Sequence, residues 1–359
     1  MDYLKDQIIT YIGNKRKILP FIERSLNQIG LKDYTFLDLF SGSGIVSRLA
    51  KVHGAKKIIA NDLEYYSMVL NRVFLRNEED DREYFDYLKQ KVLSNPLIEG
   101  WVCENYAPKD DNNIQMGERC FYTRENALLI DSYLEVLKEQ PTEVADMVIA
   151  PLIYEASVHT NTSGVFKGFY KNKQGIGQFG GEGKNALQRI CGKIDPQFPV
   201  FCPNETENII ICADASSVVK DTKIVEQAKG IDITYIDPPY NQHPYGSNYF
   251  MLNAIAECRC PKEISKVSGI PKDWNRSIYN KRAEGVMQLL KDIENVDSKY
   301  VLLSYSSEAY LPIKDMVAEL AKIGLITNLQ EIDYNVFRGS RNLSSRPKKL
   351  QEYLITIRK

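Results

Sequence analysis

Short apolar runs alternate along the chain with segments in which apolar residues recur every three or four positions. The apolar runs predict strands at 34–40, 57–60, 209–212, 231–236 and 300–304. The helical spacing predicts helices at 15–30, 45–53, 66–76 and 311–322. Two further strands, at 325–333 and 350–357, would close the pattern as a hairpin with a long connection. This alternation predicts an α/β fold, with a mixed, mostly parallel seven-stranded sheet and helices on both faces.

The pattern is interrupted between residues 77 and 207, where strands and helices no longer alternate. A stretch of this length is too long for a loop within a compact domain, so we expect a separate lobe. We therefore predict a main domain from residues 1–76 and 208–359, with residues 77–207 as an inserted domain.

Composition narrows the class of protein without identifying it. The 359 residues are 43% hydrophobic with a formal net charge of -1, which allows one large core and a second lobe. A nucleic-acid partner would then require local clusters of basic residues. No apolar run is long enough to span a membrane and the first residues lack a signal-peptide core, so we expect a cytoplasmic protein. The seven cysteines predict neither disulfides nor a metal site, since Cys258 and Cys260 have no second close pair.

The first candidate site follows the first predicted strand, in the run DLFSGSG from Asp38 to Gly44. Ligands of such sheets bind beyond the carboxyl ends of the strands, and Gly42 and Gly44 would let the backbone approach a ligand closely. A dinucleotide-binding turn has a third glycine where this chain has Ser47, so the sequence disfavours a nicotinamide cofactor. A nucleoside without pyrophosphate stays possible, and so does a tight turn that binds nothing.

Two more acidic residues end strands at the same edge of the predicted sheet. Asp62 follows the strand at 57–60 and could accept hydrogen bonds from both hydroxyls of a ribose. Asp214 follows the strand at 209–212 and could accept from the exocyclic amine of an adenine. Each has a simpler alternative, since Asp62 could be a solvated strand end and Asp214 the N-cap of a helix.

The fourth site is the most specific, because the apolar strand at 231–236 runs into Asp237-Pro238-Pro239-Tyr240. The prolines stop the strand and fix the turn, and proline has no N–H that could occupy a neighbouring acceptor. The Asp237 carboxylate and the Pro238 carbonyl would form a rigid acceptor pair, and Tyr240 would add an aromatic face. Such a site suits an exocyclic amine on a flat ring, because the amine presents two N–H donors. A plain turn is the alternative.

With these motifs the chain resembles the N6-adenine DNA methyltransferases of the D12 class, which include the Dam methylases. The run YIGNK from Tyr11 to Lys15 precedes the glycine turn, as the N-terminal cofactor motif of that family does. The insertion lies before Asp214 and Asp237, where such enzymes carry their target-recognition domain. The resemblance therefore implies the Rossmann-like fold of S-adenosylmethionine-dependent methyltransferases, with residues 77–207 as the DNA-binding, target-recognition domain.

The resemblance also assigns roles to matched positions. The cofactor S-adenosylmethionine would be bound by residues of the N-terminal motif and the strand ends: Tyr11, Lys15, Asp38, Phe40, Gly42, Gly44, Asp62, Asp214 and Asp237. The target base would be held by the turn after the fourth strand: Asp237, Pro238, Pro239 and Tyr240. Family members often have an aromatic residue directly after the acid at Asp214, where this chain has Ala215. An aromatic wall for the cofactor adenine must then come from elsewhere.

The implied reaction transfers a methyl group from S-adenosylmethionine to N6 of an adenine flipped out of double-stranded DNA. It needs no metal and no covalent nucleophile, and His243, which follows the turn, is not required as a base. The resemblance implies a prokaryotic or phage enzyme that protects DNA in a restriction–modification system. No direct contact with the cognate restriction endonuclease is implied.

Two basic clusters are candidate DNA contacts. In the insertion, aromatic residues are interleaved with Lys167, Lys171, Lys173, Lys184 and Arg189. Near the C-terminus, the connection before the last strand contains Arg338, Arg341 and Arg346. Cations mixed with glycines and aromatic residues suit contacts with phosphates and stacking on bases. A solvated surface is the alternative for each cluster, and the segment from Arg259 to Asn275 could also touch DNA.

Other functions fit parts of the same pattern. The amine pocket could hold cytosine, giving N4-methylation of DNA, or an adenine of RNA, and a DNA-binding subunit could keep the fold without catalysis. A cytosine-C5 enzyme would need a catalytic cysteine, usually in a Pro-Cys pair. The chain has the two residues only in the reverse order, as Cys202-Pro203 and Cys260-Pro261, which argues against C5 chemistry. A nicotinamide oxidoreductase is disfavoured by Ser47 and by the lack of a hydride-transfer constellation.

Overall fold

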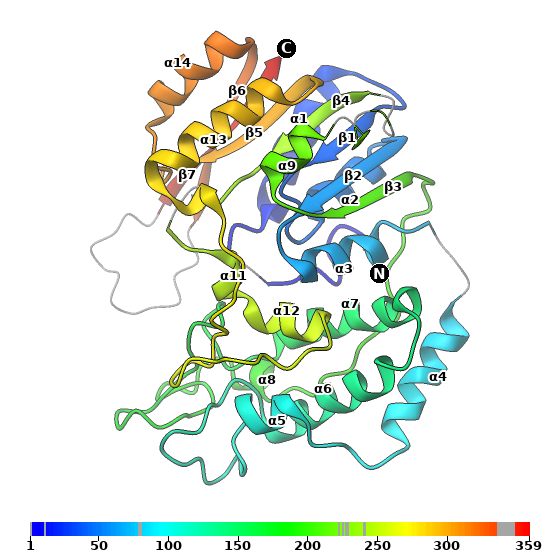
Figure 1. Cartoon of the computed structure of the whole chain (residues 1–359), viewed down its shortest axis with the longest axis vertical. Helices are drawn as coiled ribbons and strands as arrows, with labels where there is room; N and C mark the ends of the chain where they lie inside the picture. Colours follow the sequence, from blue (N-terminus) through cyan, green and yellow to red (C-terminus); the bar gives the residue numbers. More distant parts are fainter. Residues whose placement is uncertain are drawn as a thin grey trace.

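A single seven-stranded sheet forms the upper half of the molecule in Figure 1. The structure is a computed structural model that describes residues 2–10, 12–77, 81–221, 223–224, 226, 230–239, 242–335 and 349–359. The strands are β1 (Thr35–Asp38), β2 (Lys57–Asp62), β3 (Glu207–Cys212), β4 (Ile231–Ile236), β5 (Ser298–Ser306), β6 (Leu325–Asn335) and β7 (Lys349–Arg358). Their order is β3-β2-β1-β4-β5-β7-β6, and β7 runs antiparallel to both of its neighbours. The predicted mixed, mostly parallel sheet and its final hairpin are confirmed.

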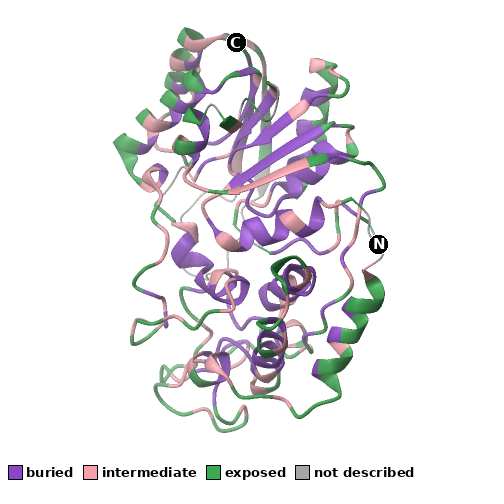
Figure 2. Ribbon diagram, turned by 45° about the vertical axis from the view of Figure 1, so that its right-hand side comes forward, coloured by how far each residue is buried: buried purple, intermediate pink, exposed green. Residues whose placement is uncertain are grey.

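Both faces of the sheet are buried, because alternate residues of each strand pack in opposite directions. In β1, Phe36 packs in one core with α1 (Leu19–Ile29) and α2 (Ile45–Val52). Leu37 packs on the other face, in a core with α9 (Ala215–Lys220), α13 (Arg282–Asn295) and α14 (Ile313–Ile323). Two short 3-10 helices, η1 (Lys15–Ile18) and η2 (Ile278–Asn280), lead into α1 and α13. The strands are mostly buried in Figure 2, so a ligand can reach the sheet only at its edges and strand ends.

A mainly helical part forms the lower half of the molecule in Figure 1. Residues 77–207 supply α4 (Arg82–Leu93), α5 (Trp101–Tyr106), α6 (Arg124–Leu137), α7 (Thr142–Val158) and α8 (Leu187–Ile190). The sequence pattern predicted no regular elements here. α7 was missed because it is apolar on most sides and contains Pro151, so it shows little helical periodicity. Among the described residues, no helix is both long and apolar enough to cross a membrane.

The core of this helical part extends beyond the insertion. α11 (Tyr245–Asn248) and α12 (Phe250–Ala256) follow β4 in sequence, yet α12 packs against α7 and against α3 (Tyr65–Phe74). The segment after α12 stays on the same part, since Tyr106 Oη donates to the Gly269 carbonyl over 2.8 Å. α3 contacts β2, β3 and α7, and so lies between the two parts. By this packing, residues 245–269 belong with the helical part and not with the sheet. The division of the chain into two domains stays a prediction.

The helical part leaves the sheet and returns to it at one place. Asn77 and Thr206 exchange two hydrogen bonds, from Asn77 Nδ2 to the Thr206 carbonyl (3.2 Å) and from the Thr206 N–H to Asn77 Oδ1 (3.0 Å). Lys51, on α2, donates from Nζ to the carbonyls of Leu75 (2.6 Å) and Arg76 (2.8 Å). At the returning end, Asn204 Nδ2 donates to the Lys51 carbonyl over 3.1 Å, so both ends of the insertion contact α2.

The N-terminal segment, residues 2–10, is fixed by Arg48, a fully buried residue of α2. Its Nη1 donates to the carbonyls of Tyr3 and Asp6, each over 3.0 Å, and its guanidinium lies 4.0 Å from the centre of the Phe74 ring. Burial lowers the pKa of Arg48 to about 10, so the side chain is still charged near neutral pH. Arg48 therefore joins the N-terminal segment to the sheet domain.

We expect Arg48→Met to lower the free energy of unfolding by about 2–4 kcal/mol, because it leaves buried carbonyls without donors. Urea unfolding followed by circular dichroism measures this difference. The control is Arg24→Met, because Arg24 is exposed and lies over Phe21, so it should change stability little. Equal losses in the two variants would contradict the anchoring role of Arg48.

Candidate active site

One pocket opens at the carboxyl ends of the parallel strands. Its lining includes residues at or just after the ends of β1 to β4, among them Phe40, Asp62, Asp214 and Asp237. α11 and the segment before α13 supply further lining residues: Tyr245, Gly246, Asn275, Ser277 and Tyr279. The three acids predicted at strand ends therefore share a single pocket, as expected for parallel strands.

The glycine turn after β1 is held against the end of β2. The Gly42 N–H donates to Asp62 Oδ2 over 2.8 Å, and the Glu64 N–H donates to Asp62 Oδ1 over 2.9 Å. Burial raises the pKa of Asp62, and these two donors oppose the rise. Gly44 has φ 74°, and a Cβ there would come within 2.6 Å of Asn71 Oδ1, so no other residue fits without a shift.

Asn61, which the sequence analysis did not single out, joins three strand ends. Its Nδ2 donates to the Leu39 carbonyl (3.0 Å) and to the Ala213 carbonyl (3.2 Å), and its Oδ1 accepts from the Ala213 N–H (3.2 Å). The backbone carbonyl of Asn61 also accepts from the Ser41 N–H over 2.8 Å. One buried amide therefore sets the spacing of the floor of the pocket.

Asp38 lies beneath the turn and is not among the residues that line the pocket. It is 1% exposed, and its Oδ2 accepts from Ser47 Oγ over 2.7 Å. No described residue hydrogen-bonds to its Oδ1. Burial raises the pKa of Asp38 to about 7, although the Ser47 hydroxyl opposes the rise.

An aromatic wall stands next to the Asp214 side of the pocket. Asp214 caps α9, because its Oδ1 accepts from the Ser216 N–H over 2.9 Å. It is therefore the helix N-cap that the sequence offered as an alternative, and it also lines the pocket. Ala215 supplies no ring. Phe40 and Tyr279 supply it instead, edge to face with ring centres 4.9 Å apart. Tyr279 Oη donates to the buried carboxylate of Asp292, which fixes the ring.

Asp237 lies where β4 ends, and Pro239 lines the pocket beside it. Lys15 Nζ lies 3.0 Å from Asp237 Oδ1, which brings the N-terminal motif to the turn. Burial raises the pKa of Asp237 to about 7; Lys15 opposes the rise, and the charge of Glu352 adds to it. Tyr240 lies outside the described residues.

Two tyrosines of the segment after the turn hold the N-terminal motif. The Ile12 N–H donates to Tyr249 Oη (2.7 Å), and Tyr245 Oη donates to the Ile12 carbonyl (3.0 Å). Gly13 has φ 82°, and a Cβ there would come within 2.9 Å of Tyr245 Oη. No motif in the sequence predicts this clamp, because its two sides are more than 230 positions apart. Tyr11 lies outside the described residues.

Glu64 is a second carboxyl group beside Asp62 that the sequence analysis missed. It is 4% exposed, and burial raises its pKa to about 7, with the Asp62 charge adding to the rise. Its Oε2 accepts from Asn253 Nδ2 on α12 and from Asn275 Nδ2 (3.1 Å). Glu64 therefore links the end of β2 to the helical part.

Comparison with known proteins identifies the family. Residues 11–174 and 198–318 match the family described as D12 class N6 adenine-specific DNA methyltransferase. The chain belongs to this family. The methyltransferase is 30% identical to the type II methyltransferase M.CviAII of Paramecium bursaria Chlorella virus 1, over 97% of this chain and 98% of that protein.

Two other relatives differ in length. The type II methyltransferase M.NlaIII of Neisseria lactamica is 28% identical over 98% of this chain and 99% of its own length. The type II methyltransferase M.FokI of Planomicrobium okeanokoites is 27% identical over 97% of this chain, which matches only 52% of that protein. The family match and these relatives confirm the expected resemblance to DNA methyltransferases of restriction–modification systems.

The predicted basic cluster of the insertion is exposed in the methyltransferase, with one exception. Its exposed members are Lys167, Lys171, Lys173 and Lys184. The Lys171 ammonium lies 4.9 Å from the centre of the Phe169 ring, and Lys173 lies 3.9 Å from Glu182. Arg189 points inward instead, donating to the carbonyls of Val158 and Thr160. Arg338, Arg341 and Arg346 lie outside the described residues.

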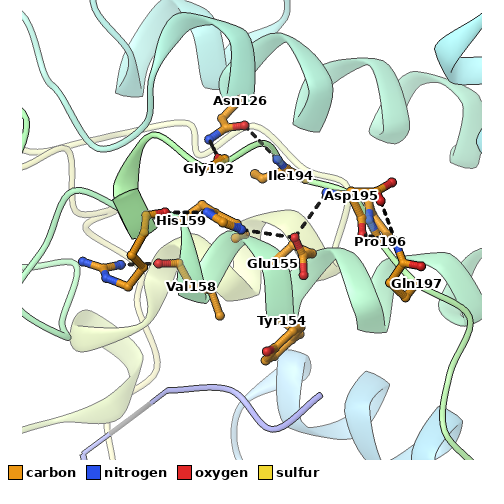
Figure 3. Close-up of polar contacts among 12 residues, drawn as sticks. Asn126, Tyr154, Glu155, Val158, His159, Gly192, Ile194, Asp195, Pro196 and Gln197 are labelled. Atoms are coloured by element: carbon orange, nitrogen blue, oxygen red, sulfur yellow. Dashed lines mark hydrogen bonds and ion pairs between the residues drawn. The ribbon is translucent and has the colours of Figure 1, made fainter. Parts of the chain in front are cut away.

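The base of this lysine-bearing segment is fastened to the end of α7 (Figure 3). His159 bonds the Arg189 carbonyl through Nδ1 over 2.5 Å, and its Nε2 lies 3.3 Å from Glu155 Oε2. Burial lowers the pKa of His159, but the hydrogen bonds to Glu155 and to the Arg189 carbonyl outweigh it, so the net pKa is raised. Asn126 fixes the segment that follows, by donating to the Gly192 carbonyl over 2.8 Å. The exposed lysines thus project from an anchored segment.

We expect Asp38→Asn to stabilise the protein at about pH 8 by roughly 1–4 kcal/mol, and by less at about pH 5. The folded pKa, about 7, lies above the ordinary 3.8, so the carboxyl stabilises the fold only while it is protonated. That contribution is complete below about pH 4 and is lost as the pH rises through 7. Urea unfolding at both pH values measures the gain.

The control is Asp315→Asn, because Asp315 is exposed on α14 and should give no pH-dependent gain. A gain in Asp38→Asn that is the same at both pH values would show that the change in stability does not come from the buried charge.

Proposed function

We propose that the methyltransferase transfers the methyl group of S-adenosylmethionine to N6 of an adenine flipped out of double-stranded DNA. One observation carries this proposal: the Asp237 turn and the Asp62 corner open into the same pocket. A group held at Asp62 and an amine held at Asp237 would therefore meet inside one pocket. Approach in line within such a space supplies up to about 7–11 kcal/mol of the barrier.

The residues of the pocket fit S-adenosylmethionine. Asp62 and the neighbouring Glu64 offer carboxylate acceptors for the two ribose hydroxyls. Phe40 and Tyr279 offer an aromatic wall for the adenine, next to Asp214, which would accept from its amine. When bound, S-adenosylmethionine supplies a methyl group that its sulfonium already activates. The protein has only to hold the donor and to make the acceptor nitrogen nucleophilic.

Asp237 and the Pro238 carbonyl would make the acceptor nitrogen nucleophilic. The amine of adenine is conjugated with its ring, so its lone pair is poorly available. Two hydrogen bonds donated by the amine, to Asp237 and to the Pro238 carbonyl, draw the nitrogen toward tetrahedral geometry. The same carboxylate stabilises the positive charge that develops on nitrogen. Tyr240 would stack on the flipped base, which restores roughly 1–3 kcal/mol of the lost stacking.

The base must leave the duplex to reach this site, because Asp237 lies at the floor of the pocket and only 17% of its side chain is exposed. The helical part would hold the DNA during this step, with residues 77–207 as the target-recognition domain. Its exposed lysines at 167, 171, 173 and 184 would contact phosphates, together with Arg338, Arg341 and Arg346.

The names of two relatives support a proposal for the biological setting of this reaction. M.CviAII and M.NlaIII are named as type II methyltransferases and match the chain over nearly their whole lengths. We therefore propose host-protective modification of DNA in the cytoplasm of a prokaryotic host or of a phage-infected cell. A cognate restriction endonuclease would share the target sequence without contacting this protein.

The native protein should transfer labelled methyl groups from S-adenosylmethionine to mixed-sequence duplex DNA, and nucleoside analysis should identify N6-methyladenine. Asp237→Ala should lose on the order of 10²–10³-fold in rate, because it removes the acceptor that stabilises the developing charge. Asp315→Ala, an exposed acid on α14, is the matched control. If the product were N4-methylcytosine, the target base would be cytosine and not adenine. If the protein bound the cofactor without methylating DNA, it would be an RNA methyltransferase or a non-catalytic subunit.

Replacing Lys171, Lys173 and Lys184 by Gln should weaken binding to duplex DNA on the order of tenfold or more at low salt. The slope of log K against log salt should fall by up to about 3, since three phosphate contacts are removed. Fluorescence anisotropy over a salt series measures both quantities. The control replaces three exposed lysines on other surfaces: Lys91, Lys138 and Lys314. Equal effects of the two triple variants would place the DNA elsewhere.

A further inference from the structure

Lys15, near the start of the sequence, lies between the carboxylates of Asp237 and Glu352. Its Nζ is 3.0 Å from Asp237 Oδ1 and 2.5 Å from Glu352 Oε1. The exposed fractions of the three side chains are 8% for Lys15, 17% for Asp237 and 8% for Glu352. Glu352 is on β7, and the sequence analysis gave it no role. Lys15 thus contacts two nearly buried carboxylates. One of them, Asp237, belongs to the turn that should hold the target base, so the other can influence that turn through the lysine.

Glu352 is the rigidly held member of this group. It lies within β7, which pairs along its length with β5 and β6, and Ser304 of β5 donates to its Oε1 over 2.9 Å. Lys15 is held less firmly, because a lysine carries its charge on a flexible four-carbon stem. The 3-10 helix that bears it has only one turn, capped by Asn14. β7 therefore holds Glu352 in place, and Lys15 connects Glu352 to the turn at Asp237.

The structure assigns to Glu352 a positioning role: it holds Lys15 Nζ against Asp237 Oδ1, so that the carboxylate keeps one orientation and presents its Oδ2 to the N6 amine. This inference rests on the proposed function of Asp237 as the acceptor for the amine. Glu352 is not a catalytic residue in this scheme, because it touches Lys15 and not the reacting atoms. Without it, Lys15 would lose one of the two carboxylates that orient its ammonium group, and Asp237 would be oriented less precisely.

The two neighbours of Asp237 act on its charge in opposite directions. Burial raises the pKa of Asp237, the ammonium of Lys15 lowers it, and the carboxylate of Glu352 raises it again. The titratable groups around this carboxyl come from five elements: Lys15 of η1, Asp38 of β1, Tyr235 of β4, Tyr245 of α11 and Glu352 of β7. Neutralising Glu352 should therefore lower the pKa of Asp237, whereas neutralising Lys15 should raise it.

The test measures the pKa of Asp237 directly in the full-length protein. Carbon-13 NMR follows the side-chain carboxyls of γ-labelled aspartate over a pH series, and Asp237→Asn assigns the resonance. The pKa should fall in Glu352→Gln, which keeps the size and the acceptor oxygen, and rise in Lys15→Met. A pKa of Asp237 that does not move in Glu352→Gln would overturn the inference.

Methyl transfer supplies the second readout. In Glu352→Gln the acid limb of the pH profile of kcat should move to lower pH, and in Lys15→Met it should move to higher pH. Glu352→Ala, which removes the anchor, should lower kcat by up to roughly 10²-fold, while the KM for S-adenosylmethionine changes little. A uniform loss of activity in Glu352→Gln, without displacement of the profile, would show a merely structural role and would contradict the inference.

The matched control is Glu319→Gln, because Glu319 forms an exposed ion pair with Lys322 on α14, 2.7 Å apart. It should change neither the Asp237 titration nor the pH profile. Circular dichroism and thermal unfolding show whether each variant is folded. If the native protein transferred no methyl group, the proposed function would be wrong. The contact of Glu352 with the Lys15–Asp237 pair could still be tested, because the NMR titration does not depend on the reaction.

Discussion

Parallel pairing of β1 to β4 gathers acidic side chains at one edge of the sheet, and most of the site can be understood as a response to that concentration of negative charge. Asp62, Asp214 and Asp237 line one pocket, and Asp38 lies just beneath it. Each has a local partner: backbone N–H groups for Asp62, the first turn of α9 for Asp214, Lys15 for Asp237 and a serine hydroxyl for Asp38. Burial raises the pKa of Asp62, Asp237 and Asp38, and in each case the local partner opposes the rise.

The sequence predicted the elements and residues whose signal is local. Strand ends, the glycine turn and the Asp237-Pro238 turn are all contiguous in sequence, and each was placed correctly at the carboxyl edge of the sheet. The residues that it missed act only through partners distant in sequence. Asn61 joins β1 and β3, Tyr279 supplies the ring absent at Ala215, and Glu352 reaches Lys15 across 337 positions. No periodicity or motif marks such contacts before the chain is folded.

The helical part was harder to predict for a different reason. α7 lies in the core of this part, so it is apolar on several sides and lacks the one-sided stripe that marks a surface helix. Arg189 was wrongly predicted to be a surface residue. By composition it belongs with the exposed lysines, but its guanidinium satisfies carbonyls at the end of α7. A charged residue can be a surface contact or an internal brace, and only the fold distinguishes the two.

The hydrogen-bonded pair of Asn77 and Thr206 closes the inserted segment at its base. The two chain ends that join the insertion to the sheet are therefore neighbours, whatever lies between them. A segment attached in this way can change its length or its surface without disturbing the register of the strands. The asparagine–threonine pair thus lets residues 77–207 vary, within limits set by the surfaces that pack against α3 and α12. Under the proposed assignment of these residues to target recognition, DNA methyltransferases with one catalytic sheet could diverge in target sequence while their chemistry stays fixed.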